Sequence, residues 1–414
     1  MDATPNLTVL ERSRISPPPA TIGHRSLPLT FFDITWLLSP PSHHLFFYHF
    51  PHSKSHFMET IVPNLKHSLS ITLQHYFPFV SNLVVFPNDS TVTKKPEIRH
   101  VEGDSVAVTF AECTLDFSDL TGNHPRKCEN FYPLVPELGS AVKESDYATL
   151  PVFSVQVTYF PNSGISIGTT NHHSLGDAST RFCFLKAWSS VYESGGDESF
   201  LANGSPPILD RLVDIPKVFE DRLKQTNLEK FYQPPSLGGP SDRVRATFVL
   251  ARTHINGLKK HVLTQLPSLE YVSSFTVTCG YIWSCIVKSF VKMGEKKGEN
   301  GFVIAAKMIG EGISKLVKNK EGILKDVERW HDGFKIPARK IGVTGTPKVD
   351  FYDIDFGWGK PTKYEVVSID NGGLFSISAS KESAQDFEIG VSFPSMQMEA
   401  FAKIFNDGLE NAIA

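Results

Sequence analysis

The stretch PVFSVQVTYFPNSGISIGTTNHHSLGDASTRFCFLKAW, residues 151–188, decides the fold. In its first half, apolar and β-branched residues alternate on both sides of Pro161-Asn162-Ser163-Gly164, which predicts two strands joined by a tight turn. In its second half, apolar residues recur at helical spacing, so we expect a helix over 178–192. His173 lies between the second strand and this helix, and we therefore expect it at a strand-to-helix turn.

Other segments carry the same kinds of pattern. Leucines and isoleucine at four-residue spacing over 61–73 predict an amphipathic helix that ends near Tyr76. The remaining expected elements are strands at 7–10, 244–250 and 349–354, and helices at 254–266 and 273–293. Strands and helices are thus both expected along the whole chain.

The length of 414 residues exceeds one ordinary hydrophobic core and favours two domains. Two polar stretches with Pro and Gly, 193–207 and 233–242, are the candidate crossover between them. We expect an N-terminal domain over 1–195, a crossover over 196–242 and a C-terminal domain over 243–414. With 41% hydrophobic and 21% charged residues, the composition is that of a globular protein.

The net charge of -3 provides no cationic field for a phosphate backbone, so nucleic acid is not an expected partner. The five cysteines are scattered and show no zinc-type spacing, which indicates reduced thiols in a cytosolic protein and no metal site. Residues 1–16 lack the apolar core of a signal peptide, and no apolar run approaches membrane-spanning length. We expect a cytosolic protein without a membrane partner.

The sequence His173-Ser174-Leu175-Gly176-Asp177 contains the candidate catalytic group. An imidazole is the side chain best suited to accept a proton near neutral pH. The bare pattern is not specific, because a chance match is expected among 15 histidines, and His100-Val101-Glu102-Gly103-Asp104 also matches. Context favours His173, which follows a strand of buried type. The alternative is a histidine satisfied by hydrogen bonds in the core, and His172 fits that alternative better.

Two neighbours of His173 have separate expected roles. Gly176 would let a ligand or the backbone approach closely. Asp177 directly precedes a helical run, so its carboxylate is suited to cap the helix and accept backbone N–H groups. We therefore expect Asp177 to give structural support rather than to take part in the reaction.

The segment Asp355-Phe356-Gly357-Trp358-Gly359 is the second candidate. Glycines on either side of Trp358 predict a tight loop that presents or packs an indole. A loop anchored by core aromatic residues is the favoured interpretation, and a role in the reaction is the alternative.

Together the two segments resemble the signatures HxxxD and DFGWG of the plant BAHD acyltransferase family, in the expected order. The similarity extends over nearly the whole chain, including LPLTFFD at 27–33 and LKHSLSITLQHYFPF at 65–79. It implies an enzyme with two chloramphenicol-acetyltransferase-like α/β domains, mixed sheets flanked by helices, and a solvent channel between the domains. It also implies a monomer that has no permanently bound cofactor and takes acyl-CoA as co-substrate.

The residues around His173 are similar to the branch of the family that acylates flavonoid and phenolic glucosides, often with malonyl-CoA. The resemblance implies that Arg181, the arginine four residues after the motif aspartate, helps to accept the malonyl carboxylate, which a guanidinium pairs with through two hydrogen bonds. The alternative is a surface or capping arginine. The resemblance thus implies malonyl transfer to a sugar hydroxyl of an anthocyanin, flavonoid or phenolic glucoside.

The resemblance also implies roles in donor binding and catalysis. Ser273 and Ser274 match a segment that lines the coenzyme channel, and Lys259 and Lys260 could meet the phosphates or be ordinary solvated charges. His173 is expected to take the proton of the acceptor hydroxyl as its oxygen attacks the thioester carbonyl, without an acyl-enzyme. The indole N–H of Trp358, in the loop with Asp355 and Gly357, is a candidate donor to the oxyanion.

One departure from the family lies near 294–301. The family normally has a longer stretch there, with an arginine-bearing strand and a YFGNC-like signature, whereas VKMGEKKGEN at 291–300 runs directly into GFVIAAKMIGEGISK at 301–315. That arginine pairs with the motif aspartate in the family, so Asp177 is expected to lack its usual partner. The alternatives are an acyltransferase-like protein inactivated by the missing segment, or an enzyme with another acyl donor and a non-glycoside alcohol or amine acceptor.

Overall fold

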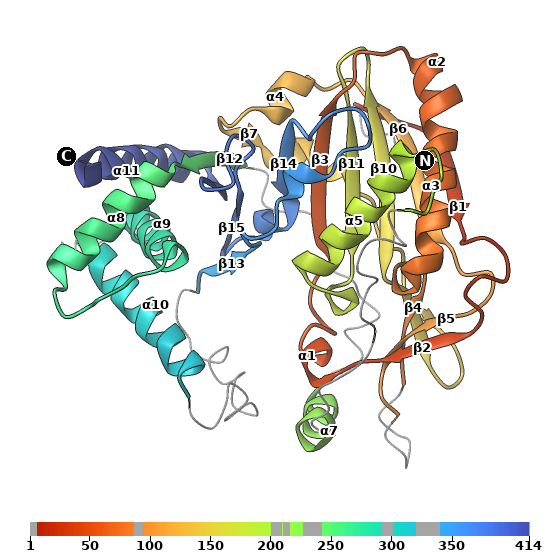
Figure 1. Cartoon of the computed structure of the whole chain (residues 1–414), viewed down its shortest axis with the longest axis horizontal. Coiled ribbons are helices and arrows are strands. Elements are labelled where there is room, and N and C mark those ends of the chain that lie inside the picture. The colour runs from red at the N-terminus through yellow and green to blue at the C-terminus, as the bar shows by residue number, and fades with distance from the viewer. Residues whose placement is uncertain are drawn as a thin grey trace. The chain divides into compact units, whose positions relative to one another are not determined.

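The structure is a computed structural model that describes residues 6–86, 94–199, 209, 216–226, 242–291, 301–319 and 340–413 (Figure 1). The chain divides into two compact units. Unit 1 contains Met1–Gly122, Glu129–Gly238 and Val349–Ser368, and unit 2 contains Asn123–Cys128, Gly239–Lys348 and Ile369–Ala414. Each unit is therefore built from both halves of the sequence.

A six-stranded mixed sheet forms the centre of unit 1. Its order is β1-β6-β10-β11-β3-β14, in which β6 and β10 are parallel and the other neighbours antiparallel. The strands are β1 (Leu7–Ile15), β3 (Ser42–His49), β6 (Val106–Cys113), β10 (Phe153–Phe160), β11 (Gly164–Asn171) and β14 (Lys363–Val366). The predicted hairpin is confirmed as β10 and β11, both buried along their full length.

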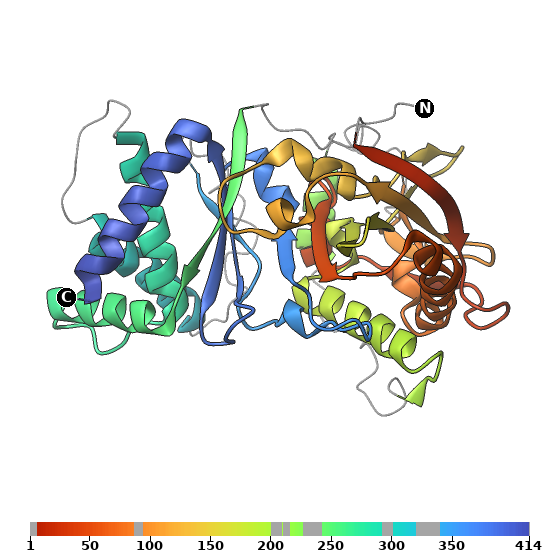
Figure 2. The same cartoon turned by 90° about the horizontal axis from the view of Figure 1, so that it is seen from above.

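Two long helices pack side by side on this sheet: α3 (Val62–His75) and α5 (Ala178–Glu193) (Figures 1 and 2). Both confirm the helices predicted from apolar spacing. The indole N–H of Trp188 in α5 donates to the hydroxyl of Ser68 in α3 over 3.1 Å, so this buried donor between the helices is paired.

Within its described residues, unit 1 also contains a second sheet and four short helices. The sheet has the order β2-β5-β4-β9-β8. Its strands are β2 (Arg25–Pro28), β4 (Asn82–Val85), β5 (Glu97–His100), β8 (Val142–Lys143) and β9 (Ala148–Pro151), and the helices are α1 (Phe31–Ile34), α2 (Lys54–His56), α4 (Phe117–Thr121) and α7 (Pro216–Gln225). All neighbours in this sheet are antiparallel.

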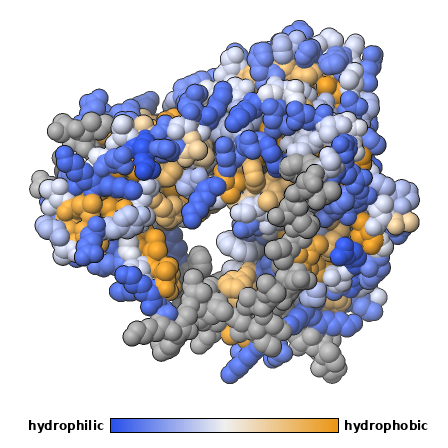
Figure 3. Space-filling view, viewed as in Figure 1, coloured by the Kyte–Doolittle hydropathy of each residue, from blue (hydrophilic) through white to orange (hydrophobic). Residues whose placement is uncertain are grey.

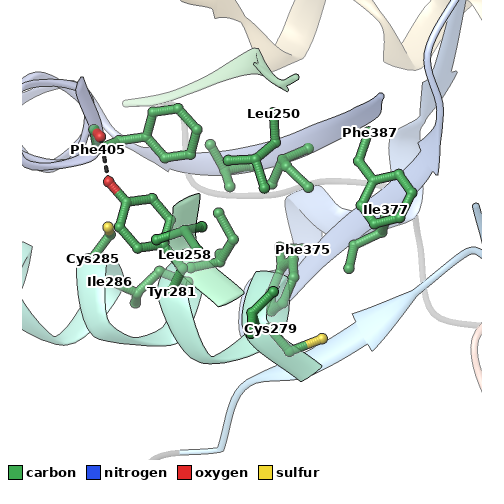
Figure 4. Packing of buried hydrophobic residues seen from close by; sticks show 14 of the residues in the cluster. Leu250, Leu258, Cys279, Tyr281, Cys285, Ile286, Phe375, Ile377, Phe387 and Phe405 are labelled. Carbon is green, nitrogen blue, oxygen red and sulfur yellow. Dashed lines mark hydrogen bonds between the residues drawn. The ribbon is translucent and has the colours of Figure 1, made fainter. Parts of the chain in front are cut away.

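Unit 2 consists of a five-stranded sheet with helices on one side of it (Figure 2). Its strands, in spatial order, are β13 (Gly342–Thr344), β15 (Leu374–Ala379), β16 (Phe387–Pro394), β12 (Arg243–Leu250) and β7 (Arg126–Lys127). Its helices are α8 (Arg252–Gln265), α9 (Ser274–Val291), α10 (Gly301–Val317) and α11 (Ser395–Ile413). Apolar side chains from sheet and helices form one core, in which the Tyr281 hydroxyl donates to the carbonyl of Phe405 (Figure 4).

The DFGWG loop belongs to unit 1, which corrects the expectation that it lies in a C-terminal domain over 243–414. The reason is strand pairing: β14 follows the loop and hydrogen-bonds antiparallel to β3. In the opposite direction, β7 comes from the N-terminal half and pairs with β12 in unit 2. Contiguous domain boundaries therefore do not describe this fold.

Other expectations from the sequence are contradicted or can be compared only in part. The strand expected at 349–354 is wrong, because Phe351–Asp353 forms a 3-10 turn whose start is capped when the Asp350 carboxylate accepts the N–H of Tyr352 over 3.0 Å. The expected crossover over 196–242 is described only in part and includes α7. The shortened stretch lies, except for residue 301, outside the described residues. None of the described helices has the length and apolar character needed to cross a membrane.

Helix α10, which follows the shortened stretch, exposes an apolar surface. Ile304, Met308, Leu316 and Val317 have exposed fractions between 53% and 71%. Figure 3 shows apolar patches at the surface of this part of unit 2. The helix packs on α9 with another of its faces, where Ala305 and Ala306 are buried.

Candidate active site

The turn that holds His173 is fixed by hydrogen bonds from its neighbours. His173–Leu175 is a 3-10 turn between β11 and α5, as predicted. The His172 ring contacts the carbonyl of Leu37 through Nε2 at 3.3 Å and accepts the N–H of Ser174 through Nδ1 at 3.2 Å. The Ser174 hydroxyl donates to the carbonyl of Asp33 over 3.1 Å. His172 is thus a core histidine with both ring nitrogens bonded, and the turn is tied to residues 33–37.

His173 itself is half-buried and lies against an aromatic side chain. The indole of Trp36 stacks on its imidazole, with ring centroids 4.0 Å apart. The imidazole of His173 hydrogen-bonds the backbone of the same residue, and this bond favours the protonated ring. The backbone partner is therefore the carbonyl oxygen, which accepts. Of the two ring nitrogens, only Nδ1 can reach it. This leaves Nε2 as the nitrogen that can accept a proton.

The electrostatic surroundings keep His173 neutral. Burial is the largest cause that lowers the pKa of His173, and the positive charge of Arg181 lowers it further, while Asp177 acts in the opposite direction. A neutral imidazole at pH 7 is the form that a general base requires. The geometry and charge of this position therefore suit proton abstraction.

Asp177 lies at the surface and caps α5. Its carboxylate accepts the N–H of Thr180 over 2.9 Å and the Thr180 hydroxyl over 3.0 Å. The expected loss of its usual arginine partner leaves no buried charge, since the side chain is exposed. Gly176 serves the same turn: a Cβ there would lie 2.6 Å from the Thr180 side chain, so this glycine leaves room for Thr180 rather than for a ligand.

Arg181 is buried in the first turn of α5, which excludes the surface alternative. It hydrogen-bonds the hydroxyl of Tyr364 in β14, and its guanidinium carbon lies 5.4 Å from the ring centroid of Phe351. The Tyr364 hydroxyl is also 2.9 Å from Nδ1 of His44 in β3. An unpaired buried donor costs about 1–3 kcal/mol, yet within the described part of the chain Nε of Arg181 and Nε2 of His44 have no partner.

The DFGWG loop is a tight turn packed by aromatic rings. The Asp355 carboxylate accepts the N–H groups of Gly357 and Gly359 at 2.8 and 3.0 Å, and both glycines have positive φ values. Trp358 packs edge-on against Tyr48 and Tyr192, and its indole hydrogen-bonds the Tyr192 hydroxyl. This packing favours the structural interpretation, because the N–H considered for the oxyanion already has an acceptor.

The coenzyme candidates lie in unit 2. The Ser273 hydroxyl caps α9 by accepting the N–H of Thr276 over 3.0 Å, next to Ser274 at the first position of the helix. Ser273 and Tyr271 line a cavity of about 670 Å³ beside α10. The Lys259 ammonium lies 5.9 Å from the Tyr271 ring centroid, and burial lowers the pKa of Lys259. Lys260 is exposed on α8.

Three residues of the site were not found from the sequence. Trp36, His44 and Tyr364 come from distant segments, and pairing of β14 with β3 brings the latter two together. Apolar periodicity carries no signal for such contacts. The only hint was the resemblance of LPLTFFD at 27–33, which directly precedes the segment that carries Trp36.

These features, a neutral histidine at a strand-to-helix turn and a buried arginine beside it, fit the resemblance seen in the sequence. The family model of the transferase family matches residues 6–308 and 295–407. The chain therefore belongs to this family, in its BAHD branch, and is an acyl-CoA-dependent acyltransferase. This confirms the family inferred from the HxxxD and DFGWG segments.

Individual relatives place it more closely. It is 70% identical, over 459 aligned positions and 100% of both chains, to the malonyl-coenzyme A:anthocyanin 3-O-glucoside-6''-O-malonyltransferase of Dahlia pinnata. It is 39% identical to the malonyl-coenzyme:anthocyanin 5-O-glucoside-6'''-O-malonyltransferase of Salvia splendens, over 97% of this chain and 95% of that one. The crystal structure of vinorine synthase, 16% identical, superposes with a TM-score of 0.68 over 95% and 96% of the two chains, which confirms the fold.

The comparisons also locate the shortening. The alignment with the Dahlia enzyme has 459 positions against 414 residues here, so at least 45 positions have no counterpart in this chain. The family model matches in two pieces that overlap over 295–308, which includes the start of α10. This overlap lies where the shortening was predicted, next to the exposed apolar face of α10.

Proposed function

We propose that this chain transfers a malonyl group from malonyl-CoA to a sugar hydroxyl of an anthocyanin or a related flavonoid or phenolic glucoside. The names of the Dahlia and Salvia relatives support this substrate pair. The observation that carries the proposal is Arg181, a buried cation that retains an unpaired N–H and acts electrostatically on the ring of His173. Such a group suits a donor whose acyl chain ends in a carboxylate.

In the proposed reaction His173 is the general base. Nε2 takes the proton from the sugar hydroxyl while the oxygen forms a bond to the thioester carbonyl carbon. The tetrahedral oxyanion then collapses, the carbon–sulfur bond breaks, and the proton on His173 neutralises the departing thiolate. The lowered pKa of His173 supports the first step, because the free base form is present before the acceptor binds. Asp177 supports the geometry by capping α5.

Arg181 holds the free carboxylate of the malonyl group in this proposal. Its burial removes competing water, and its guanidinium carbon lies over the ring of Phe351, 5.4 Å from the centroid. A carboxylate bound here at one end of a three-carbon acyl group would have its thioester at the other end. The donor is then positioned by its charge as well as by its coenzyme part.

For the coenzyme part we propose the start of α9 and the neighbouring lysines of α8. Ser273 lines the cavity beside α10, and Lys259 contacts Tyr271 at its edge. Lys260, exposed one residue further on, would meet a phosphate from solvent. The helix start offers N–H groups from Ser274 onward, which suits an anion.

The proposal includes a monomer in the cytosol. All five cysteines are free, four of them buried, which supports a reducing compartment. The monomer is the expectation from the family resemblance. Size-exclusion chromatography with light scattering checks it, and a mass twice that of the chain would contradict it.

The test of the function is a transfer assay. The purified chain is incubated with malonyl-CoA and a panel of anthocyanin and flavonol glucosides, with the matching aglycones as controls, and products are read by mass spectrometry. We expect glucosides, but not aglycones, to gain one malonyl group. Products from free alcohols or amines instead would contradict the proposed acceptor class.

A second candidate function has its own observation. It is an acyltransferase-like protein that does not turn over substrate. At least 45 aligned positions of the Dahlia enzyme have no counterpart in this chain, and α10 exposes an apolar face, and both observations favour this candidate. No product with any acceptor, from a chain that unfolds cooperatively, would support it. Insertion of the corresponding segment of the Dahlia enzyme would then restore transfer and raise the unfolding temperature.

A further inference from the structure

A buried polar cluster in unit 1 joins Arg181, Tyr364 and His44, which come from α5, β14 and β3. Their exposed fractions are 8%, 6% and 3%. Phe351 closes one side, since its ring stacks on that of Tyr364 with centroids 4.6 Å apart. Tyr364 is the central member, because its hydroxyl is bonded to both of the others.

The directions of these hydrogen bonds follow from the chemistry of the groups. Arginine only donates, so the Tyr364 oxygen accepts from Arg181. The single proton of the Tyr364 hydroxyl then has an acceptor in Nδ1 of His44, 2.9 Å away. Burial lowers the pKa of His44 well below its usual value, so its ring is neutral and its one proton is on Nε2.

Two donors remain after this assignment. Nε–H of Arg181 and Nε2–H of His44 are both buried, and neither has an acceptor in the part of the chain that the structure describes. Buried donors are normally paired, so two in one cluster indicate that an acceptor is supplied by a ligand. The charge of Arg181 lowers the pKa of His44 and of His173, and His173 also lowers the pKa of His44. Arg181, His44 and His173 therefore lie close to one another.

We propose that Tyr364 is a positioning residue that presents the free N–H groups of Arg181 and His44 to the carboxylate of an acidic acyl-CoA. The inference rests on the proposed function and deepens it, because it names what makes the site selective for malonyl over neutral acyl groups. A carboxylate has two oxygens, and each would accept one of the two unpaired donors. Neutral acyl groups have no such acceptor and gain nothing from the arrangement.

Tyr364→Phe tests this with little change to the fold. The ring that stacks on Phe351 remains, and so does the backbone N–H of Tyr364 that donates to the Tyr352 hydroxyl. Only the hydroxyl is lost, so Arg181 loses its acceptor and His44 is free to place its proton on Nδ1. Tyr281→Phe is the matched control, because it removes a buried hydroxyl bond in unit 2.

Binding of malonyl-CoA and of acetyl-CoA is measured by calorimetry on the wild type and both variants. We expect Tyr364→Phe to weaken malonyl-CoA binding about tenfold and to leave acetyl-CoA within twofold, while Tyr281→Phe changes neither. Tyr364→Phe should weaken malonyl-CoA binding less in the Arg181→Gln background than in the wild type, because Tyr364 then acts through His44 alone.

Equal weakening for both donors, or no change for malonyl-CoA, would overturn the inference. Because binding does not require turnover, this result is independent of the transfer assay. Selective binding without transfer would keep the role of Tyr364 and reject the proposed function. Malonyl transfer by the wild type, together with unchanged donor selectivity in Tyr364→Phe, would keep the proposed function and reject the role of Tyr364.

Discussion

The indole of Trp36 lies nearly parallel to the imidazole of His173, with 13° between the ring planes and 4.0 Å between centroids. Trp36 is 42% exposed, so the histidine is covered by a side chain that is itself open to solvent. The segment that carries Trp36 is fixed to the histidine turn through Asp33 and Leu37. The stack therefore sets the orientation of the ring that we propose as the base.

Removal of this stack should impair the chemical step. We expect Trp36→Ala to lower kcat roughly 10- to 100-fold with a smaller effect on KM, since a small misplacement of a catalytic group costs about that much. Trp36→Phe keeps an aromatic face and should recover most of the rate. Trp283→Ala, at a similarly exposed tryptophan in unit 2, is the control. Full activity in Trp36→Ala would show that the stack is not needed.

The sequence predicted the elements that hold His173 but not its neighbours. The hairpin of β10 and β11 and the helix α5 follow from local periodicity, and Asp177 was correctly interpreted as a helix cap. The contacts of His173 with Trp36, and of Arg181 with Tyr364, join residues far apart in the chain. Only strand pairing and side-chain packing decide them, and a single sequence contains no measure of either.

The charge of Arg181 should be detectable in the titration of His173. That charge lowers the pKa of His173, so Arg181→Gln should raise it towards 6.5, although burial continues to hold it below that value. Nuclear magnetic resonance of histidine-labelled protein, assigned with His173→Ala, measures the shift. Arg252→Gln in unit 2 is the control and should leave it unchanged. A pKa that falls or stays constant in Arg181→Gln would contradict the cluster geometry.

Buried neutral histidines should make unit 1 sensitive to acid. Burial lowers the pKa of His43 and of His172 to about 4, whereas an unfolded histidine takes up its proton near 6.5. Between pH 6.5 and 4 the unfolded chain therefore binds more protons. As the pH decreases from 6.5 to 4, each histidine should therefore lower the free energy of unfolding by up to about 1.4 kcal/mol per pH unit.

Urea unfolding followed at pH 7.5 and 5 checks this dependence. In His172→Gln, whose amide can still donate to the carbonyl of Leu37, the decrease between the two pH values should be smaller. The same urea midpoint at both pH values would contradict the neutral, buried state of these rings.

Unit 2 contains a buried ion pair. Arg245 and Asp370 meet at 3.0 Å with side-chain exposed fractions of 1% and 2%. Arg245→Met should destabilise the unit by about 3–5 kcal/mol, because the buried carboxylate loses the positive charge of Arg245, and the double variant with Asp370→Leu should recover most of the loss. The exposed pair of Lys403 and Asp407 is the matched control, and Lys403→Met should cost under about 1 kcal/mol. Equal effects in chemical unfolding would refute the distinction.

The domain boundaries show where sequence reasoning reached its limit. The alternation at 349–354 was interpreted as a strand, but Phe351 and Tyr352 are both buried in a 3-10 turn, which breaks the rule that successive strand residues face opposite sides. The DFGWG loop was expected in the C-terminal domain over 243–414, together with the residues around it in the sequence. Strand β14, which follows the loop, instead joins the sheet of unit 1. By contrast, the shortening near 294–301 was predicted from the family resemblance, which needs no knowledge of contacts, and the two pieces of the family match overlap at 295–308.

The most direct measurement is the single-turnover rate of malonyl transfer to an anthocyanin 3-O-glucoside by the wild type, His173→Ala and His100→Ala. His100 is the other histidine of a His-x-x-x-Asp pattern, lies in the second sheet of unit 1, and contacts Asp104 at 3.6 Å. We predict that His173→Ala lowers the rate by about 10²–10⁴, as expected for loss of a general base, and that folded His100→Ala stays within a few-fold of the wild type. A rate in His173→Ala equal to that of the wild type would contradict the central claim that His173 is the base.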